Sequence, residues 1–159
     1  MGEISAGKTS LLNTILGLKN PTSIGHQTKY VSLVFETSAV QIFDSPGNNK
    51  DFAFYDIKTL NLLHQMDKVL LLYSNSLLSV KNILLVLKQI KPNSTYLIRT
   101  QCDLFSDKDS STLDQELAND KAYLKDEIKH NFPIYASSAR KGLDFRNNLT
   151  IKKMLEGAI

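Results

Sequence analysis

The sequence opens with a glycine-lysine motif that dictates what must surround it. Residues 2–9 read GEISAGKT, which matches the G-x-x-x-x-G-K-T spacing of a loop that cradles phosphate groups. Such a loop lies between a buried strand and a helix, and the first N–H groups of that helix point at the phosphate. The run SLLNTILGL at 10–18 supplies the helix, whereas only Met1 precedes the motif. The motif therefore predicts a phosphate site on an α/β scaffold and leaves the position of its strand open.

Length and composition fit one globular domain over residues 1–159. Hydrophobic residues make up 42% and charged residues 22% of the chain, which argues against disorder. The net charge of +3 suits an anionic ligand but is too small for a nucleic-acid-binding surface. Cys102 is the only cysteine, so no internal disulfide can form and we expect a reducing, cytoplasmic location. No apolar run is long enough to form a membrane segment.

Short β-prone runs alternate with helical patterns along the chain. Residues 29–36 and 39–44 are separated by two residues and predict an antiparallel hairpin. Three apolar runs predict buried parallel strands, at 68–74, 95–100 and 132–138. Helices are predicted at 8–19, 52–66, 79–91, 113–130 and 143–156. Together they predict a three-layer α/β sandwich whose sheet is mostly parallel with one antiparallel hairpin strand.

The strand before the phosphate loop is the element this pattern lacks. In the fold that the order of motifs described below resembles, this strand lies near the middle of the sheet, and Met1 could be at most its last residue. An empty position there would expose two strand edges and apolar surface. We therefore expect the first strand to be missing from the chain and the natural polypeptide to start upstream. A sheet that closes without a leading strand would contradict this hypothesis.

Each residue of the glycine-lysine loop has an expected task. The N–H groups from Ser5 through Thr9 can surround a phosphate, because Gly2 and Gly7 permit the tight backbone path. Lys8 would bridge the β- and γ-phosphates, and the Thr9 hydroxyl would bind Mg²⁺. The alternative is an accidental glycine loop with a surface lysine.

Two later segments complete a magnesium site. In IFDSPGNN, Asp44 ends a strand and can hold the metal, while the Gly47 amide can reach a γ-phosphate. Thr28 precedes the hairpin, where its hydroxyl could complete the metal shell. Read structurally, D-S-P-G is a good turn and Thr28 one more loop threonine.

Two strand ends suggest a base site. Asp103, in IRTQCDLF, can accept hydrogen bonds from the ring N–H and the exocyclic amine of guanine, which adenine does not offer on that edge. In YASSARKG, the Ala139 N–H could meet the guanine carbonyl, and Ser138 leaves room for the base. Arg140 would flank the base or lie in solvent. Taken singly, these residues could equally be a helix cap and loop residues.

Four motifs in this order resemble the GTP-binding domain of translation-factor and Ras-like (TRAFAC-class) P-loop GTPases. GEISAGKTSLLNTILG is similar to the first motif of dynamin-like GTPases, and YLIRTQCD resembles the R-T-K-x-D form of immunity-related GTPases. The resemblance implies that GTP or GDP and Mg²⁺ are the ligands, and that a nucleotide-dependent dimer or an activating partner is possible. The residues it assigns to nucleotide binding are Gly2, Glu3, Ser5, Ala6, Gly7, Lys8, Thr9, Ser10, Gly47, Thr100, Gln101, Asp103, Ser138, Ala139 and Arg140. It assigns the metal to Thr9, Thr28 and Asp44, and catalysis to Lys8, Ser5, Thr28 and Asn48.

The sequence departs from the family pattern at several positions. Gln101 replaces a lysine that covers the base, so weaker nucleotide affinity is expected. Asn48 stands where a water-orienting glutamine is common, and Ile4 replaces a polar catalytic residue of dynamin. With no arginine placed as a built-in finger, we expect hydrolysis well below about one per second. A nucleotide-binding module with little hydrolysis, and a P-loop ATPase or kinase, remain as alternatives.

Overall fold

The computed structural model describes residues 1–3, 5–19, 31–45, 47–48, 57–105 and 110–158. Its strands are β1 Gly2–Glu3, β2 Ser32–Glu36, β3 Gln41–Asp44, β4 Gly47–Asn48, β5 Val69–Tyr73, β6 Thr95–Arg99 and β7 Ile134–Ala136. Its α-helices are α1 Lys8–Leu16, α2 Ile57–Gln65, α3 Lys81–Ile90, α4 Ser110–Tyr123 and α5 Asn148–Leu155. Three short helical turns complete it: η1 Leu77–Val80, η2 Cys102–Leu104 and η3 Leu124–Ile128.

The central sheet is parallel and has the strand order β4-β1-β5-β6-β7. Its longest pairing runs the full length of β5 and β6, from Val69 opposite Thr95 to Tyr73 opposite Arg99. Strands β2 and β3 form a separate antiparallel hairpin. The predicted fold class, mostly parallel with one antiparallel hairpin, is therefore confirmed.

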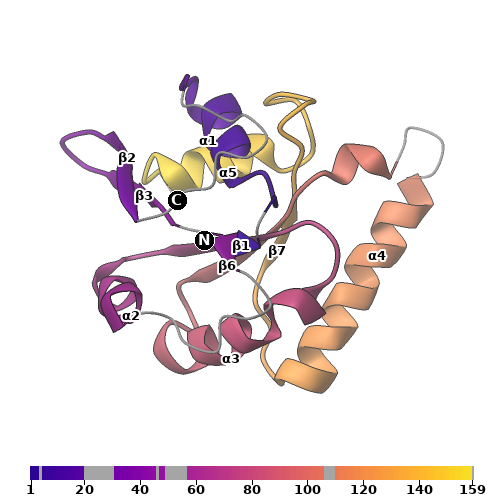
Figure 1. Cartoon of the computed structure of the whole chain (residues 1–159). Coiled ribbons are helices and arrows are strands. Elements are labelled where there is room, and N and C mark those ends of the chain that lie inside the picture. The colour runs from indigo at the N-terminus through magenta and orange to yellow at the C-terminus, as the bar shows by residue number, and fades with distance from the viewer. Residues whose placement is uncertain (4, 20–30, 46, 49–56, 106–109, 159) are drawn as a thin grey trace.

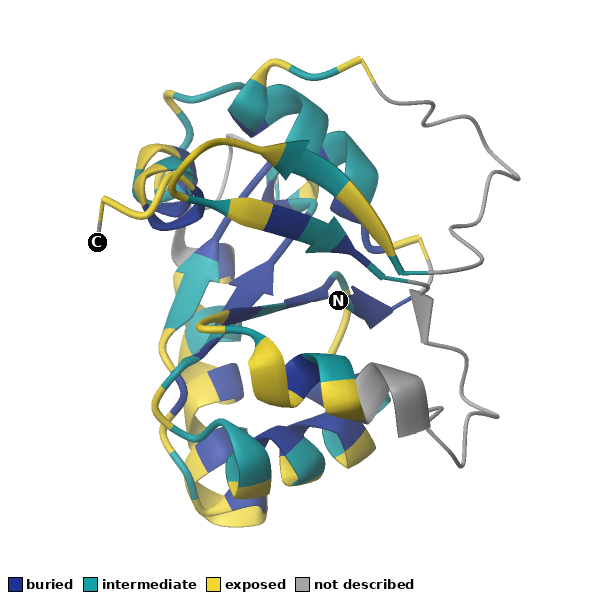
Figure 2. Cartoon of the chain, turned by 90° about the vertical axis from the view of Figure 1, so that its left-hand side faces the viewer, coloured by how far each residue is buried: buried dark blue, intermediate teal, exposed yellow. Residues whose placement is uncertain are grey.

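Helices cover both faces of the sheet, as Figure 1 shows: α1 and α5 lie on one side, and α2 and α3 on the other. Side chains of β5 alternate between the two sides, as expected of a strand buried on both faces. Leu71 and Tyr73 pack with α3 and η3, whereas Leu72 packs with α1 and α5. In Figure 2 the buried positions gather on the strands and on the helix faces turned toward them.

The helix boundaries differ from the sequence prediction where polar groups cap the chain. The helix predicted at 79–91 begins as η1, because Ser76 Oγ accepts a hydrogen bond from Leu78 N. The helix predicted at 143–156 starts only at Asn148, whose N–H donates to Phe145 O across a turn. The helix predicted at 113–130 starts at Ser110 and ends in the wide turn η3. Of the helix predicted at 52–66, residues 52–56 lie outside the described part.

The expectation that at most Met1 could occupy the central strand position was wrong. Gly2 and Glu3 form a two-residue strand there, with Gly2 paired to Gly47 on one side and to Leu72 on the other. Met1 continues this alignment, because Leu72 N donates to Met1 O and the Met1 amine donates to Leu70 O over 2.9 Å. Gly2 and Glu3, the first two residues of the motif, therefore form the short strand that leads into the phosphate loop.

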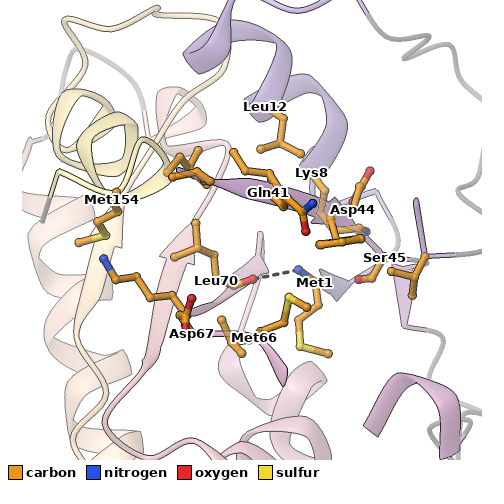
Figure 3. A pocket seen from close by; sticks show the side chains of 18 of the residues that line it. Met1, Lys8, Leu12, Gln41, Asp44, Ser45, Met66, Asp67, Leu70 and Met154 are labelled. Atoms are coloured by element: carbon orange, nitrogen blue, oxygen red, sulfur yellow. Dashed lines mark hydrogen bonds between the residues drawn. The ribbon is translucent and has the colours of Figure 1, made fainter. Parts of the chain in front are cut away.

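A cavity of about 750 Å³ lies next to Met1, between β3 and β5. We call it the β3–β5 groove. Figure 3 shows the Met1 amine at its edge, pointing toward Leu70, with Gln41 and Asp44 on one side and Met66 on the other. Its lining is mainly apolar and includes Leu12, Ile42, Leu63, Leu70, Ile151 and Met154. The groove therefore runs along the stretch of β5 that β1 is too short to cover.

Candidate functional site

The glycine-lysine loop has the backbone of an anion cradle. Ser5 and Gly7 both adopt left-handed conformations, with φ of 61° and 71°. Alternation of such residues with right-handed ones turns successive N–H groups toward a common centre. Gly7 also precedes the first residue of α1, and no side chain caps that end of the helix. The loop therefore presents backbone donors and the positive end of a helix dipole together.

Lys8 is folded back over this loop. Its Nζ donates to Glu3 O over 2.9 Å, and only 9% of the residue is exposed. Burial lowers the pKa of Lys8 from its ordinary value, while the charges of Asp44 and Glu3 act in the opposite direction. A buried cation that lies against the phosphate loop, within reach of the charges of Asp44 and Glu3, is arranged to bind phosphate oxygens.

Thr9 and Asp44 meet from opposite sides of the site. Thr9 Oγ1, on the first turn of α1, donates to Asp44 Oδ2 at the end of β3 over 2.9 Å. A hydroxyl and a carboxylate are oxygen ligands of the kind Mg²⁺ takes, with waters and phosphate oxygens completing its shell. Within the described residues no cluster of three His, Cys, Asp or Glu side chains could hold a metal. The Thr9 hydroxyl and the Asp44 carboxylate would therefore fit Mg²⁺ that is also bound by oxygens of a phosphate ligand.

Two predicted members of this part of the site are only partly described. Gly47 and Asn48 form β4, whose backbone pairs directly with Gly2 and Glu3, so Gly47 lies beside the start of the glycine-lysine motif. The side chain of Asn48 and the whole of Thr28 lie outside the described residues. Their predicted roles in catalysis and metal binding stay predictions.

Two segments that are predicted to bind the base meet here. Residues 100–105, which we call the base segment, follow β6, and residues 137–140, the second segment, follow β7. Ser138 Oγ donates to Asp103 Oδ1 over 2.7 Å, and Arg140 Nη1 lies 3.7 Å from Asp103 Oδ2. Asp103 is largely buried, whereas Arg140 is 79% exposed. Thr14 Oγ1 of α1 donates to Ala139 O over 3.0 Å and holds the second segment against the phosphate-loop helix.

Hydrogen bonds join the base segment to the phosphate loop. Thr100 Oγ1 donates to Ala6 O over 2.8 Å, and Gln101 Nε2 donates to Ser5 O over 3.0 Å. The sequence analysis expects weaker nucleotide affinity from Gln101, because glutamine is shorter than the family's lysine and uncharged. The structure shows that the glutamine still reaches the phosphate loop, since Gln101 itself adopts a left-handed backbone conformation with φ 57°.

Glu3 has a different role from its neighbours. Its carboxylate accepts hydrogen bonds from Ser74 N, Ser74 Oγ and Ser79 Oγ, in the chain that follows β5. Only its backbone carbonyl faces Lys8. The carboxylate of Glu3 therefore anchors the phosphate loop to the sheet. Ser10 lies half-buried on the first turn of α1.

Sequence reasoning missed two asparagines that shape the base site. Asn148 is fully buried; it donates to Ser138 O over 2.7 Å and to Gly142 O, and accepts from Ser137 Oγ over 2.5 Å. Asn147 Oδ1 accepts from Ala136 N over 3.0 Å. Both were assigned to the interior of a helix, because a single sequence does not distinguish a structural asparagine from a solvent-facing one.

Comparison with known proteins supports the architecture. No protein-family model matches the chain, and no curated protein matches its sequence. Among solved structures, bacterial selenocysteine-specific elongation factor EF-Sec matches with a TM-score of 0.67 at 18% identity over 99% of this chain. Elongation factor SelB of Methanococcus maripaludis, in complex with the GTP analogue GppNHp, matches with a TM-score of 0.65 at 17% identity over 99% of this chain. Toc33 of Arabidopsis thaliana, in complex with GDP and Mg²⁺, matches with a TM-score of 0.62 at 16% identity over 87% of this chain.

These proteins share the fold of this chain. The chain spans 28% of the length of EF-Sec, 32% of SelB and 68% of Toc33. Its α/β architecture, a mostly parallel sheet with an antiparallel hairpin, matches the Ras-like G-domain fold of these structures.

Proposed function

We propose that the chain binds GTP or GDP with Mg²⁺ and hydrolyses GTP slowly, as a conformational switch. The observation that carries the proposal is the link from Asp103 to the phosphate loop. Asp103 follows Gln101 by two residues, and Gln101 Nε2 bonds to Ser5 O at 3.0 Å. A carboxylate that selects guanine is thus held at a fixed place relative to a phosphate cradle.

Each end of the nucleotide has its own residues. The N–H groups of Ser5 through Thr9 and the ammonium of Lys8 would hold the β- and γ-phosphates. Thr9 and Asp44 would hold Mg²⁺, which neutralises charge on the phosphate oxygens. Because Thr9 and Asp44 already touch, little rearrangement is needed to place both beside one ion.

The base end favours guanine over adenine. Asp103 would accept hydrogen bonds from the ring N–H and the exocyclic amine, and the Ala139 N–H would donate to the guanine carbonyl oxygen. Ser138 already donates to one oxygen of Asp103 and so fixes the orientation of its carboxylate. With adenine the carboxylate would lose both hydrogen bonds from the base, which costs several kcal/mol in a site shielded from water.

Slow hydrolysis follows from where the arginines lie. The chain has three arginines, Arg99, Arg140 and Arg146. They pair with Asp120 and Glu116, with Asp103, and with Asp114, respectively. Arg99 and Arg146 thus form ion pairs with residues of α4, and Arg140 lies near Asp103 in the base segment. An arginine supplied by a partner raises the rate of such reactions by roughly 10³–10⁵-fold. Ser5 and Asn48 would orient the attacking water in its absence.

A dynamin-like or immunity-related identity is the finer form of this proposal. It is supported by the motifs GEISAGKTSLLNTILG and RTQCD and implies activation by a second copy or by another protein at a cytoplasmic site. None of the described helices reaches the length and apolarity needed to cross a membrane. Hydrolysis per molecule that rises with protein concentration would support self-activation; a constant rate would favour a separate activating partner or a binding module.

The decisive experiment compares GTP with ATP by isothermal titration calorimetry in the presence of Mg²⁺. We expect GTP to bind at least about 100-fold more tightly. Asp103→Asn should abolish most of this preference, whereas Asp114→Asn, which removes an exposed carboxylate on α4, should retain it. Equal affinity for the two nucleotides, or an unchanged preference in Asp103→Asn, would refute guanine recognition. Single-turnover assays then decide between slow hydrolysis and binding alone.

A further inference from the structure

A buried charged cluster lies beneath the base segment, outside the residues assigned to nucleotide contact. Arg99, the last residue of β6, is 2% exposed. Its Nη1 lies 2.5 Å from Asp120 Oδ2, and its Nη2 lies 3.0 Å from Glu116 Oε2, both on α4. Tyr73 Oη donates to the same oxygen of Asp120 over 2.7 Å. The cluster therefore links α4 to the carboxyl ends of β5 and β6.

The same arginine contacts both sides of the base segment. Its guanidinium carbon lies 5.1 Å from the centre of the Phe105 ring, just beyond η2. Its carbonyl oxygen accepts from Ser137 N over 2.8 Å and from Cys102 Sγ over 3.2 Å. The carbonyl of Arg99 thus contacts the segment 100–105 at Cys102 and its side chain contacts the segment at Phe105, and Asp103 lies between these two residues.

The cluster also reaches the phosphate loop through one further loop. Arg99 Nη2 donates to Asn75 O over 3.0 Å, and the preceding residue, Ser74, donates to the carboxylate of Glu3. Residues 74–75 are consequently held by Arg99 on one side and by the phosphate loop on the other. The carboxylate of Glu3 keeps its own hydrogen bonds to Ser74 and Ser79, so loss of the Arg99 side chain should act mainly on the base segment.

A guanidinium buried this deeply has a large desolvation cost that only good geometry offsets. Burial alone would lower the pKa of Arg99, but attraction and hydrogen bonding from Asp120 raise it above its ordinary value, so the side chain stays charged. Two well-packed apolar residues would stabilise the same contact at lower cost. A planar fork, by contrast, fixes direction as well as distance: Nη1 meets Asp120 and Nη2 meets Glu116 and Asn75 O, while the buried Nε has no hydrogen-bond partner among the described residues.

We infer that Arg99 is a positioning residue for base recognition: clamped by Asp120 and Glu116, it orders the segment 100–105 and thereby sets the direction of the Asp103 carboxylate. The inference rests on the proposed guanine site and adds a specificity-determining residue to it. Arg99 does not itself touch the base in this account. Its loss should therefore reduce discrimination between bases more than it reduces affinity for phosphate.

The test measures three ligands on the full chain, each with Mg²⁺. GTP reports both hydrogen bonds of Asp103, inosine triphosphate lacks the exocyclic amine, and inorganic tripolyphosphate reports the phosphate loop alone. Arg99→Lys keeps the charge but loses the fork, and Phe105→Leu removes the stacking surface without unpairing a buried charge. The matched control is Arg146→Lys, which alters an exposed pair between Arg146 and Asp114, also on α4.

We expect the preference for GTP over inosine triphosphate to fall by about tenfold in Arg99→Lys and about threefold in Phe105→Leu. Tripolyphosphate affinity should stay within about twofold, and the control should match the wild type. Amide hydrogen exchange at 100–105 should accelerate in both variants while exchange in α1 does not.

Two outcomes would overturn the inference: an unchanged preference in both variants, or equal losses for GTP and tripolyphosphate, as a purely structural role would give. If Arg99→Lys does not fold, Phe105→Leu decides by the same criteria. Equal affinity of the wild type for GTP and ATP, measured separately, would refute the proposed function itself. The exchange data would then still show whether Arg99 orders the segment.

Discussion

Thr9 Oγ1 and Asp44 Oδ2, which are 35 residues apart in the chain, lie 2.9 Å from each other. One is on the helix after the phosphate loop and the other at the end of a hairpin strand. No local interaction brings them together; the packing of the hairpin and α1 against the central sheet does. Their contact makes the magnesium part of the site testable separately from the base part.

Asp44→Asn should remove the magnesium dependence of nucleotide binding. An amide has no charge to attract the cation, so affinity in Mg²⁺ should fall by about tenfold or more, while affinity in EDTA should change little. Thr9→Val should act in the same direction. Asp126→Asn, at an exposed position in η3, is the control and should keep the wild-type response to Mg²⁺. A full magnesium response in Asp44→Asn, measured by calorimetry, would exclude Asp44 as a metal ligand.

Gln101→Ala should weaken nucleotide binding because it removes the bond to Ser5 O that ties the base segment to the phosphate loop. One neutral hydrogen bond contributes about 0.5–1.5 kcal/mol, so a loss of roughly 3–10-fold is expected. Gln101→Lys should restore or exceed the wild-type affinity. Gln115→Ala, an exposed glutamine on α4, should have no effect. If Gln101→Ala binds GTP as tightly as the wild type, the link is not functional.

Gly2→Ala should be severely destabilising. Gly2 has φ 147°, and a Cβ there would lie 1.9 Å from Leu72 O. This oxygen is a backbone atom of the neighbouring strand β5 and cannot move aside. Gly17→Ala provides the contrast: its φ is 67°, but a Cβ would have no atom within 4 Å, so the cost should be about 1 kcal/mol. Urea unfolding of both variants checks the difference. Equal free energies of unfolding would mean that Gly2 does not lie between β4 and β5.

The stability of the chain that starts at Met1 should depend on the Met1 amine. Burial, and then the nearby charge of Lys8, lower the pKa of this amine from 8.0 to about 5, against an opposing effect of Asp44. Between those values the unfolded chain binds a proton that the folded chain does not. The free energy of unfolding should therefore be highest above pH 8 and fall as the pH approaches 5, by up to a few kcal/mol at ~1.4 kcal/mol per pKa unit.

The matched control is the same chain with an acetylated amine, which cannot titrate but retains one N–H to donate to Leu70 O. The difference between the two unfolding curves isolates the amine from the carboxylates and histidines that titrate over the same range. Parallel curves from pH 5 to pH 8 would show that the Met1 amine is not buried in solution.

The local elements were readable from the sequence. Period-two and apolar runs predicted the hairpin and strands β5 to β7, because strands buried on both faces need continuous apolar side chains. Gly7, Lys8 and Thr9 predicted the start of α1 to the residue. Boundaries such as the start of α5 were missed, since a turn held by Asn148 competes with the helical pattern over 143–147.

What the sequence by itself determined is which side chains stand at the strand ends: the glycine-lysine loop, Thr9 and Asp44, and Asp103, for which it predicts phosphate, Mg²⁺ and guanine as ligands. Only the tertiary structure decided how these pieces meet. It placed Gly2 and Glu3 in the central strand position, because backbone groups of β4 and β5 on either side needed partners. It also buried Arg99 beneath the base segment, in contact with α4 and with the chain after β5, because a guanidinium can be buried only where acceptors from several distant segments converge.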